Sequence, residues 1–193
     1  VRVPVTLDLK TMALYAAIDA VEIYANLNTG DVYARYPGVQ AMVNFAVATF
    51  GKLDVIVNNA VLTSDQNPAD SFDEDYWDRL MAVDLKGVAL CQKYALQQMK
   101  AQGHGGSIIN ISSVSGFRPQ AETIAYVAAK HGVIGLTKVA ALENGQYNIR
   151  VNSVAPGAID TPMLRGAMEQ FGLEEETYAP QLSLLNRFGQ PRE

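Results

Sequence analysis

The sequence predicts an α/β domain built on a mostly parallel sheet. Three short segments that read as strands alternate with stretches of helical apolar spacing. These segments are Leu53–Val57, Ser107–Ile111 and Ile149–Val154, and the first two are short buried runs. Strands separated by helices pair in parallel, because each connection crosses back over one face of the sheet. With 193 residues the chain can bury a sizeable core, so we expect a single domain over residues 1–193.

Composition excludes several classes of protein. The net charge of −5, without a basic cluster, argues against a nucleic-acid partner. The single cysteine, Cys91, excludes a disulfide framework and fits a reducing cytoplasm, where we expect the protein to be located. His104 and His131 have no ligand-like companions, so we expect no metal site. No apolar run is long enough to cross a bilayer, so we expect no membrane partner.

The first thirty residues are atypical for this fold. Val1–Leu7 has the composition of a strand, and Pro4 would confine it to a sheet edge. Thr11–Leu27 carries apolar residues at helical spacing, which predicts a helix.

Two helices are expected before the strand Ser107–Ile111, one on each side of Leu53–Val57. The apolar face of residues 39–50 predicts a helix that ends at Gly51. Ser71 and Glu74 form a possible capping box, which would open a long helix through about Ala101.

Two further helix signals follow the strand Ser107–Ile111. Val127–Leu142 is a predicted helix in which Gly132 and Gly135 leave a surface for close packing. Thr161 has the character of an N-cap, and the proline after it suits the first position of a helix.

The chemical centre of the sequence lies between Ser113 and Lys130. Tyr126 and Lys130 are four residues apart, so on a helix they share one face. Ser113 follows a predicted strand, where its hydroxyl could meet the phenol and the ammonium. A serine hydroxyl can orient a carbonyl or alcohol oxygen by a neutral hydrogen bond.

Lys130 gives Tyr126 a possible role as a general acid and base. A free phenol has a pKa of about 10 and is a poor proton donor or acceptor at neutral pH. An ammonium roughly 4 Å away favours the phenolate by about 4 kcal/mol at an effective dielectric constant of about 20. We therefore expect Lys130 to bring the pKa of Tyr126 towards 7, less the opposing effect of burial.

Motifs around these residues resemble the short-chain dehydrogenase/reductase family over about residues 31–193. They are N-N-A at Asn58–Ala60, I-S-S at residues 111–113, Y-x-x-x-K at residues 126–130, R-V-N-S-V-A-P-G at residues 150–157 and I-D-T-P-M at residues 159–163. Ser113, Tyr126 and Lys130 match the catalytic residues of that family. The resemblance implies a Rossmann-like, doubly wound sheet and an NAD- or NADP-dependent oxidoreductase that interconverts an alcohol and a carbonyl compound.

Asp84 occupies the position of the family's fourth catalytic residue, which is normally asparagine. In the family this residue helps to hold a water linked to the active-site lysine. Aspartate keeps an acceptor at this position but loses the amide donor and adds a charge. Two interpretations stay open, an impaired relay through Asp84 and an ordinary helix residue that is bonded locally.

The resemblance also implies a set of cofactor contacts beyond Tyr126 and Lys130. They are Asp31, Val32, Asn59, Ala60, Ile159 and Thr161. In the family the second asparagine of N-N-A stabilises the sheet, and the turn after it borders the cofactor ribose. The residue that selects NAD or NADP is not identifiable in this sequence.

The sequence also departs from the family in ways that bear on the cofactor. The family's T-G-x-x-x-G-x-G turn is not found in residues 1–30, where Gly30 is the only glycine. Val61 stands where a glycine normally follows N-N-A, and Glu193 comes before the family's last helix and strand. We therefore expect a domain truncated at both ends. We expect the chain to bind the cofactor weakly or not at all. The loss of two or three charge-assisted hydrogen bonds to the pyrophosphate would weaken binding by roughly 3–9 kcal/mol.

Two kinds of function follow. The first is turnover of a small alcohol or carbonyl substrate beneath a lid at Met163–Leu185, which the resemblance implies. The alternative is a cofactor-free pseudoenzyme or oligomeric scaffold. For either we expect a homodimer or homotetramer, since family members commonly pair the helices that correspond to Glu74–Ala101 and Val127–Leu142.

Overall fold

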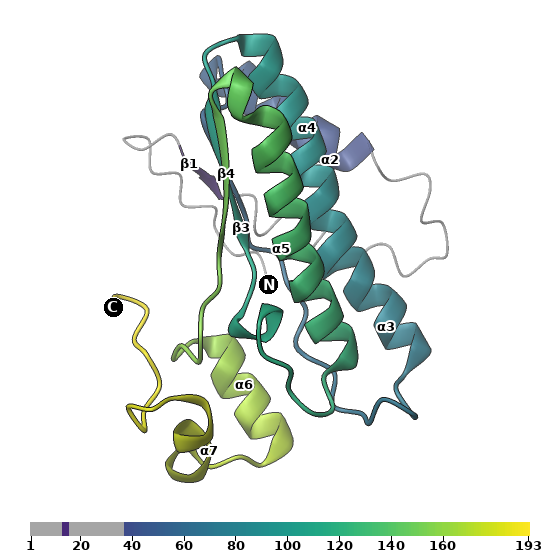
Figure 1. Ribbon diagram of the computed structural model, residues 1–193, viewed down its shortest axis with the longest axis vertical. Helices are drawn as coiled ribbons and strands as arrows, with labels where there is room; N and C mark the ends of the chain where they lie inside the picture. The colour runs from purple at the N-terminus through teal and green to yellow at the C-terminus, as the bar shows by residue number, and fades with distance from the viewer. Residues whose placement is uncertain (1–12, 16–36) are drawn as a thin grey trace. The chain divides into compact units, whose positions relative to one another are not determined.

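The computed structural model describes residues 13–15 and 37–193 of the chain (Figure 1). The chain divides into two compact units, Val1–Val154 and Ala155–Glu193. The predicted single domain stays a prediction, and each unit is described by itself below. Within the described residues, no helix is both long enough and apolar enough to cross a membrane.

The first unit contains a four-stranded parallel sheet, which confirms the predicted α/β class. Its order is β1 (Ala13–Tyr15), β2 (Val55–Asn58), β3 (Gly106–Ile111) and β4 (Ile149–Val154). Parallel strands end at the same edge of their sheet. The residues that follow β2 and β3 therefore meet at the carboxyl edge, where open α/β sheets bind ligands.

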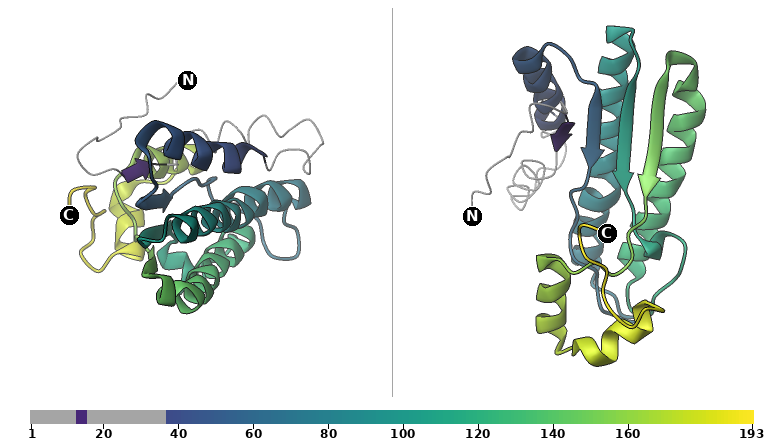
Figure 2. Two further views of the ribbon diagram at one scale, coloured as in Figure 1. Left: turned by 90° about the horizontal axis from the view of Figure 1, so that it is seen from above. Right: turned by 90° about the vertical axis from the view of Figure 1, so that its left-hand side faces the viewer.

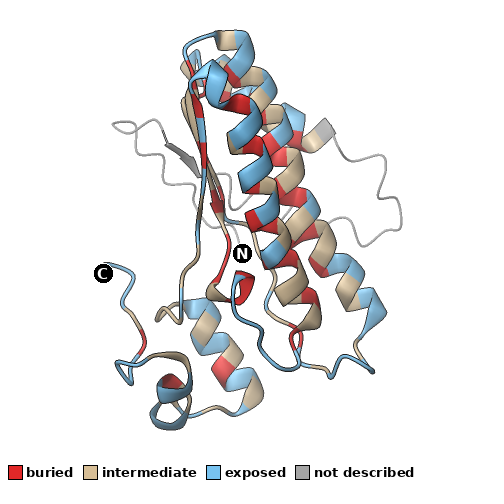
Figure 3. Ribbon diagram, viewed as in Figure 1, coloured by how far each residue is buried: buried red, intermediate tan, exposed pale blue. Residues whose placement is uncertain are grey.

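Three helices pack side by side on one face of this sheet, with α4 in the middle (Figure 2). They are α2 (Pro37–Phe50), α4 (Val88–Gln102) and α5 (Ile124–Asn144). Buried and exposed residues alternate along α4 and α5, as expected for helices that have one apolar face (Figure 3). The core between the layers includes Val43, Ile56, Ala95, Met99, Ile108 and Val151. A short 3₁₀ turn at Gly145–Tyr147 leads from α5 into β4.

Most predicted elements agree with the structure, but the helix expected over Thr11–Leu27 is wrong at its described residues. Ala13–Tyr15 forms β1 and pairs in parallel with Val55–Val57 of β2. Three residues cannot reveal a helical or an extended period by themselves, and hydrogen bonding to the edge of β2 decides the outcome. The strand expected at Val1–Leu7 lies outside the described residues.

The long helix of the sequence analysis begins with a different cap and contains an irregular turn. Its first part, α3 (Glu74–Met81), is capped by Asp73, whose carboxylate accepts the Tyr76 N–H at 2.9 Å. Ser71 is therefore not the N-cap, and its hydroxyl faces the Asp70 carboxylate instead. A π-helical turn at Ala82–Gly87 joins α3 to α4 and carries Asp84. Such turns are often found at functional sites.

The second unit contains α6 (Pro162–Phe171) and α7 (Glu175–Leu182). Thr161 caps α6 by accepting the Leu164 N–H at 3.3 Å, which confirms the predicted helix start. Met168, Ala179 and Phe188 form its buried core. The proposed lid role of Met163–Leu185 stays a prediction.

Candidate active site

Ser113 stands in the loop that joins β3 to α5. It opens a short 3₁₀ turn, Val114–Gly116, and its hydroxyl oxygen accepts the Ser115 N–H at 3.1 Å. The neighbouring Ser112 hydroxyl donates to the Lys130 carbonyl at 2.9 Å, which ties the loop to α5. Gly116 makes this approach possible, since a Cβ there would lie 2.6 Å from the Ser112 hydroxyl oxygen and 2.9 Å from the Lys130 carbonyl oxygen.

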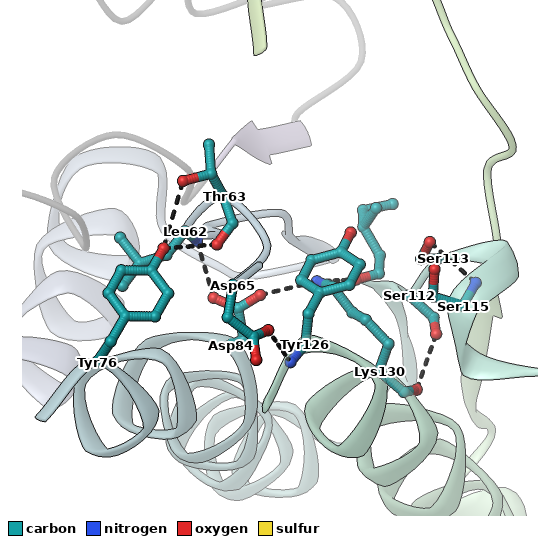
Figure 4. Close-up of polar contacts among 11 residues, drawn as sticks. Leu62, Thr63, Asp65, Tyr76, Asp84, Ser112, Ser113, Ser115, Tyr126 and Lys130 are labelled. Atoms are coloured by element: carbon teal, nitrogen blue, oxygen red, sulfur yellow. Dashed lines mark hydrogen bonds and ion pairs between the residues drawn. The ribbon is translucent and has the colours of Figure 1, made fainter. Parts of the chain in front are cut away.

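Tyr126 and Lys130 stand on the first turns of α5, and the Lys130 side chain runs towards the Tyr126 ring (Figure 4). The helix begins at Ile124, three residues before the predicted start, so both side chains stand on regular helix and share a face. Lys130 Nζ lies 5.3 Å from the centroid of the Tyr126 ring, and the Ser113 side chain is close enough to lower the pKa of the Tyr126 phenol. The structure therefore brings the hydroxyl, the phenol and the ammonium together at the carboxyl edge of the sheet.

Asp84 joins this group through Lys130. Its Oδ2 lies 3.4 Å from Lys130 Nζ, and its Oδ1 accepts the Leu62 N–H at 2.8 Å. Both side chains are almost fully buried, at 0% exposure for Asp84 and 2% for Lys130. Asp84 is therefore not a locally bonded helix residue, because both of its contacts come from distant parts of the chain.

Burial dominates the titration of this ion pair. It raises the pKa of the Asp84 carboxyl to about 6, against the lowering effects of the Lys130 ammonium and the Leu62 N–H. Burial also lowers the pKa of Lys130, while the Asp84 charge acts in the opposite direction. Among the described residues, Asp84 Oδ2 has no well-aligned hydrogen-bond donor. A buried pair of this kind costs desolvation energy that its attraction does not fully offset.

The expectation that Lys130 brings the pKa of Tyr126 towards 7 is wrong for this arrangement. Burial raises the pKa of the phenol, the Ser113 hydrogen bond lowers it, and the Asp84 carboxylate raises it further. The ammonium lies over the ring while it is paired with Asp84. The neighbouring negative charge therefore cancels much of the attraction that Lys130 would exert on a phenolate.

A buried polar network behind the site was not foreseen from the sequence. Asn58 Nδ2 donates to Asn110 Oδ1 at 2.7 Å, and Asn110 Nδ2 donates to both Gln92 and Thr137. The pairing of Asn58 with Asn110 follows from the register of β2 and β3. It is thus the first asparagine of N-N-A that binds within the sheet, while Asn59, the one expected to do so, is exposed.

The remaining predicted cofactor contacts stay predictions. Ala60 follows β2 and is partly buried. Ile159 and Thr161 lie in the second unit, where Ile159 pairs with Gly189 and Thr161 caps α6. Asp31 and Val32 lie outside the described residues.

Comparison with known proteins identifies the relatives of this chain. The sequence pattern of the short chain dehydrogenase family matches residues 6–171. Short chain dehydrogenase/reductase astE of Aspergillus oryzae is 50% identical over 160 residues, which cover 83% of this chain and 61% of that protein. Levodione reductase of Leifsonia aquatica is 39% identical and covers 80% of this chain and 59% of its own length.

Solved structures agree with the sequence relatives. A crystal structure of levodione reductase matches with a TM-score of 0.75 and 38% identity, over 80% of this chain and 61% of that one. ElxO with NADP bound matches with a TM-score of 0.74 and 32% identity, over 80% and 62% of the two chains. These likenesses confirm the Rossmann-like fold. The chain spans about three fifths of the length of the curated relatives it matches.

Proposed function

The chain belongs to the short-chain dehydrogenase/reductase family, and on this premise we propose that it is an NAD- or NADP-dependent oxidoreductase for a small alcohol or carbonyl substrate. One observation carries the proposal. Tyr126, Ser113 and the buried Lys130 meet beside one another at the carboxyl edge of the sheet. This trio suits proton transfer to and from a substrate oxygen.

In this proposal, Tyr126 is the general acid and base. Because burial raises the pKa of the phenol, Tyr126 holds its proton at neutral pH and donates it from Oη to a carbonyl oxygen as that oxygen gains charge. Ser113 donates a hydrogen bond to the same oxygen and orients it. Lys130 stabilises the phenolate that remains, and Asp84 weakens this effect by pairing with the ammonium. Oxidation of an alcohol reverses the path of the proton.

The described residues fit the nicotinamide end of a dinucleotide. The Tyr126 phenol and the Lys130 ammonium can hold the hydroxyls of a ribose, since an ammonium has three donors and the Ile111 carbonyl accepts from Lys130 Nζ at 3.4 Å. Bound NAD or NADP would donate or accept the hydride. We assign further contacts to Asn59, Ala60, Ile159 and Thr161, and to Asp31 and Val32 beyond the described residues. ElxO, a relative of known structure, binds NADP.

One observation favours a second candidate function, a cofactor-free scaffold. Asp84 neutralises the cation on which the phenol depends, and the pKa of Tyr126 is raised. A chain without turnover tolerates such an arrangement, because nothing then requires the phenol to ionise.

Titration of the purified chain with NADH and NADPH separates these functions. For the oxidoreductase we expect nicotinamide fluorescence to change on binding, and carbonyl compounds such as levodione to consume the reduced cofactor. Tyr126→Phe should lower turnover by about 10²–10⁴-fold while the cofactor still binds. Tyr94→Phe on α4, which also alters a partly buried tyrosine, is the matched control. Equal turnover by the wild type and Tyr126→Phe would refute the mechanism, and a folded chain that binds neither cofactor would count against the oxidoreductase.

A further inference from the structure

Helix α5, which carries Tyr126, lacks a cap from its own N-terminal residues. Thr123 occupies the N-cap position, but its side chain makes no capping hydrogen bond and donates instead to the Gln120 carbonyl at 3.1 Å. The first N–H groups of a helix have no partners within the helix and need acceptors from elsewhere. At a partly buried helix start, an unpaired N–H group costs free energy because water cannot replace the missing acceptor.

Those acceptors come from Asp65, in the loop that follows β2. Its Oδ2 accepts the Ala125 N–H at 3.0 Å, and its Oδ1 accepts the N–H of Tyr126 itself at 3.2 Å. The Asp65 side chain is buried, with a residue exposure of 6%. A carboxylate at this end of a helix also gains from the positive end of the helix dipole.

The loop that contains Asp65 binds both the start of α5 and Asp84. Asn67 forms a parallel bridge with Thr123, and its N–H donates to the Glu122 carbonyl at 2.9 Å. Three residues before Asp65, the Leu62 N–H donates to Asp84. The same short segment therefore contacts the partner of Lys130 and the start of the helix that presents Tyr126.

We propose that Asp65 is a positioning residue for the active site, which sets the place and direction of the Tyr126 side chain by binding the backbone at the start of α5. Two bonds from one rigid carboxylate to successive N–H groups define the orientation of the first helical turn. Tyr126 lies in that turn, so its phenol moves with it. This inference rests on the proposed role of Tyr126, but its test does not depend on turnover.

Asp65→Ala and Asp73→Ala form a matched pair for the test. Each removes a helix-capping carboxylate, but Asp73 caps α3, whereas Asp65 binds the start of α5. We expect amide hydrogen exchange at Ala125 and Tyr126 to become at least about tenfold faster in Asp65→Ala and to stay within about twofold of the wild type in Asp73→Ala. Asp65→Asn, which keeps one acceptor oxygen, should expose one of the two amides and protect the other. If Asp65→Ala does not fold, hydrogen exchange in Asp65→Asn tests the proposal instead.

Titration of the Tyr126 phenol provides a readout that loss of a distant cap would not change. Its absorbance is isolated by subtracting the same variant with Tyr126→Phe. Because burial raises the pKa of this phenol, loosening of the helix start in Asp65→Ala should lower it, while Asp73→Ala should leave it unchanged. The proposal is overturned if the two amides exchange no faster than in Asp73→Ala, or if the Tyr126 titration does not move. If both readouts change while no substrate is turned over, Asp65 keeps its positioning role and the proposed oxidoreductase activity fails.

Discussion

Replacement of Asp84 by asparagine should change how the stability of this protein depends on pH. Burial raises the pKa of Asp84 from its ordinary 3.8 to about 6, so the folded chain binds a proton more tightly than the unfolded chain between these values. The stability of the wild type therefore falls as the pH rises from about 4 to about 6. At about 1.4 kcal/mol for each pKa unit, ionisation of Asp84 costs about 3 kcal/mol of folding free energy.

Asp84→Asn removes this titration and keeps the acceptor for the Leu62 N–H. We expect the stability of the variant, relative to the wild type, to increase by about 3 kcal/mol between pH 4 and pH 7. Without the carboxylate, nothing opposes the effect of burial on Lys130, so the pKa of Lys130 should fall further. A lowered lysine pKa makes stability rise with pH between the folded and unfolded pKa values, which acts in the same direction.

The measurement is urea unfolding of both proteins at several pH values, with Asp70→Asn as the control, because Asp70 is an exposed carboxylate. If the free energies of unfolding of Asp84→Asn and the wild type differ by the same amount at every pH, the reasoning is refuted. It would mean that Asp84 titrates alike in the folded and unfolded chains.

Three further predictions follow from particular contacts. Gly116→Ala should destabilise the protein by about 1–3 kcal/mol and reduce turnover, because its Cβ would press on the Ser112 hydroxyl and the Lys130 carbonyl; chemical unfolding and initial rates measure the two effects. Asn110→Ala should cost about 1–3 kcal/mol in unfolding experiments, since it leaves the buried Asn58 amide without its partner. Light scattering should show a homodimer or homotetramer, and Leu142→Glu, at an 86% exposed position on α5, should shift it towards the monomer if this helix forms the interface.

The chemical centre was predictable from the sequence because its signals are local. The Tyr126–Lys130 spacing places two side chains on one helix face whatever lies around them. Thr161 caps α6 through an N–H only three residues away. The β4 strand has the predicted bounds because buried and exposed side chains alternate from Ile149 to Asn152 and turn residues lie on either side.

Where long-range contacts compete with local signals, sequence reasoning failed. The helical spacing around Ala13–Tyr15 gave way to pairing with the edge of β2. Ser71 had the pattern of a cap, but the carboxylate of Asp73 reaches the free N–H group of α3. The choice of Asn58 over Asn59 for the sheet depended on which of the two the strand register placed opposite Asn110.

By itself, the sequence determined the α/β class, the family and the identity of the Ser113, Tyr126 and Lys130 trio, since composition, period and motif spacing are properties of the chain alone. Only the tertiary structure decided the charge balance around the trio. Asp84 reaches Lys130 from a separate helix, and burial raises the pKa of Asp84 and Tyr126 and lowers that of Lys130. The energy of a charge depends on how much solvent folding removes from it and on which other charges folding brings near. The spacing of residues along a chain determines neither.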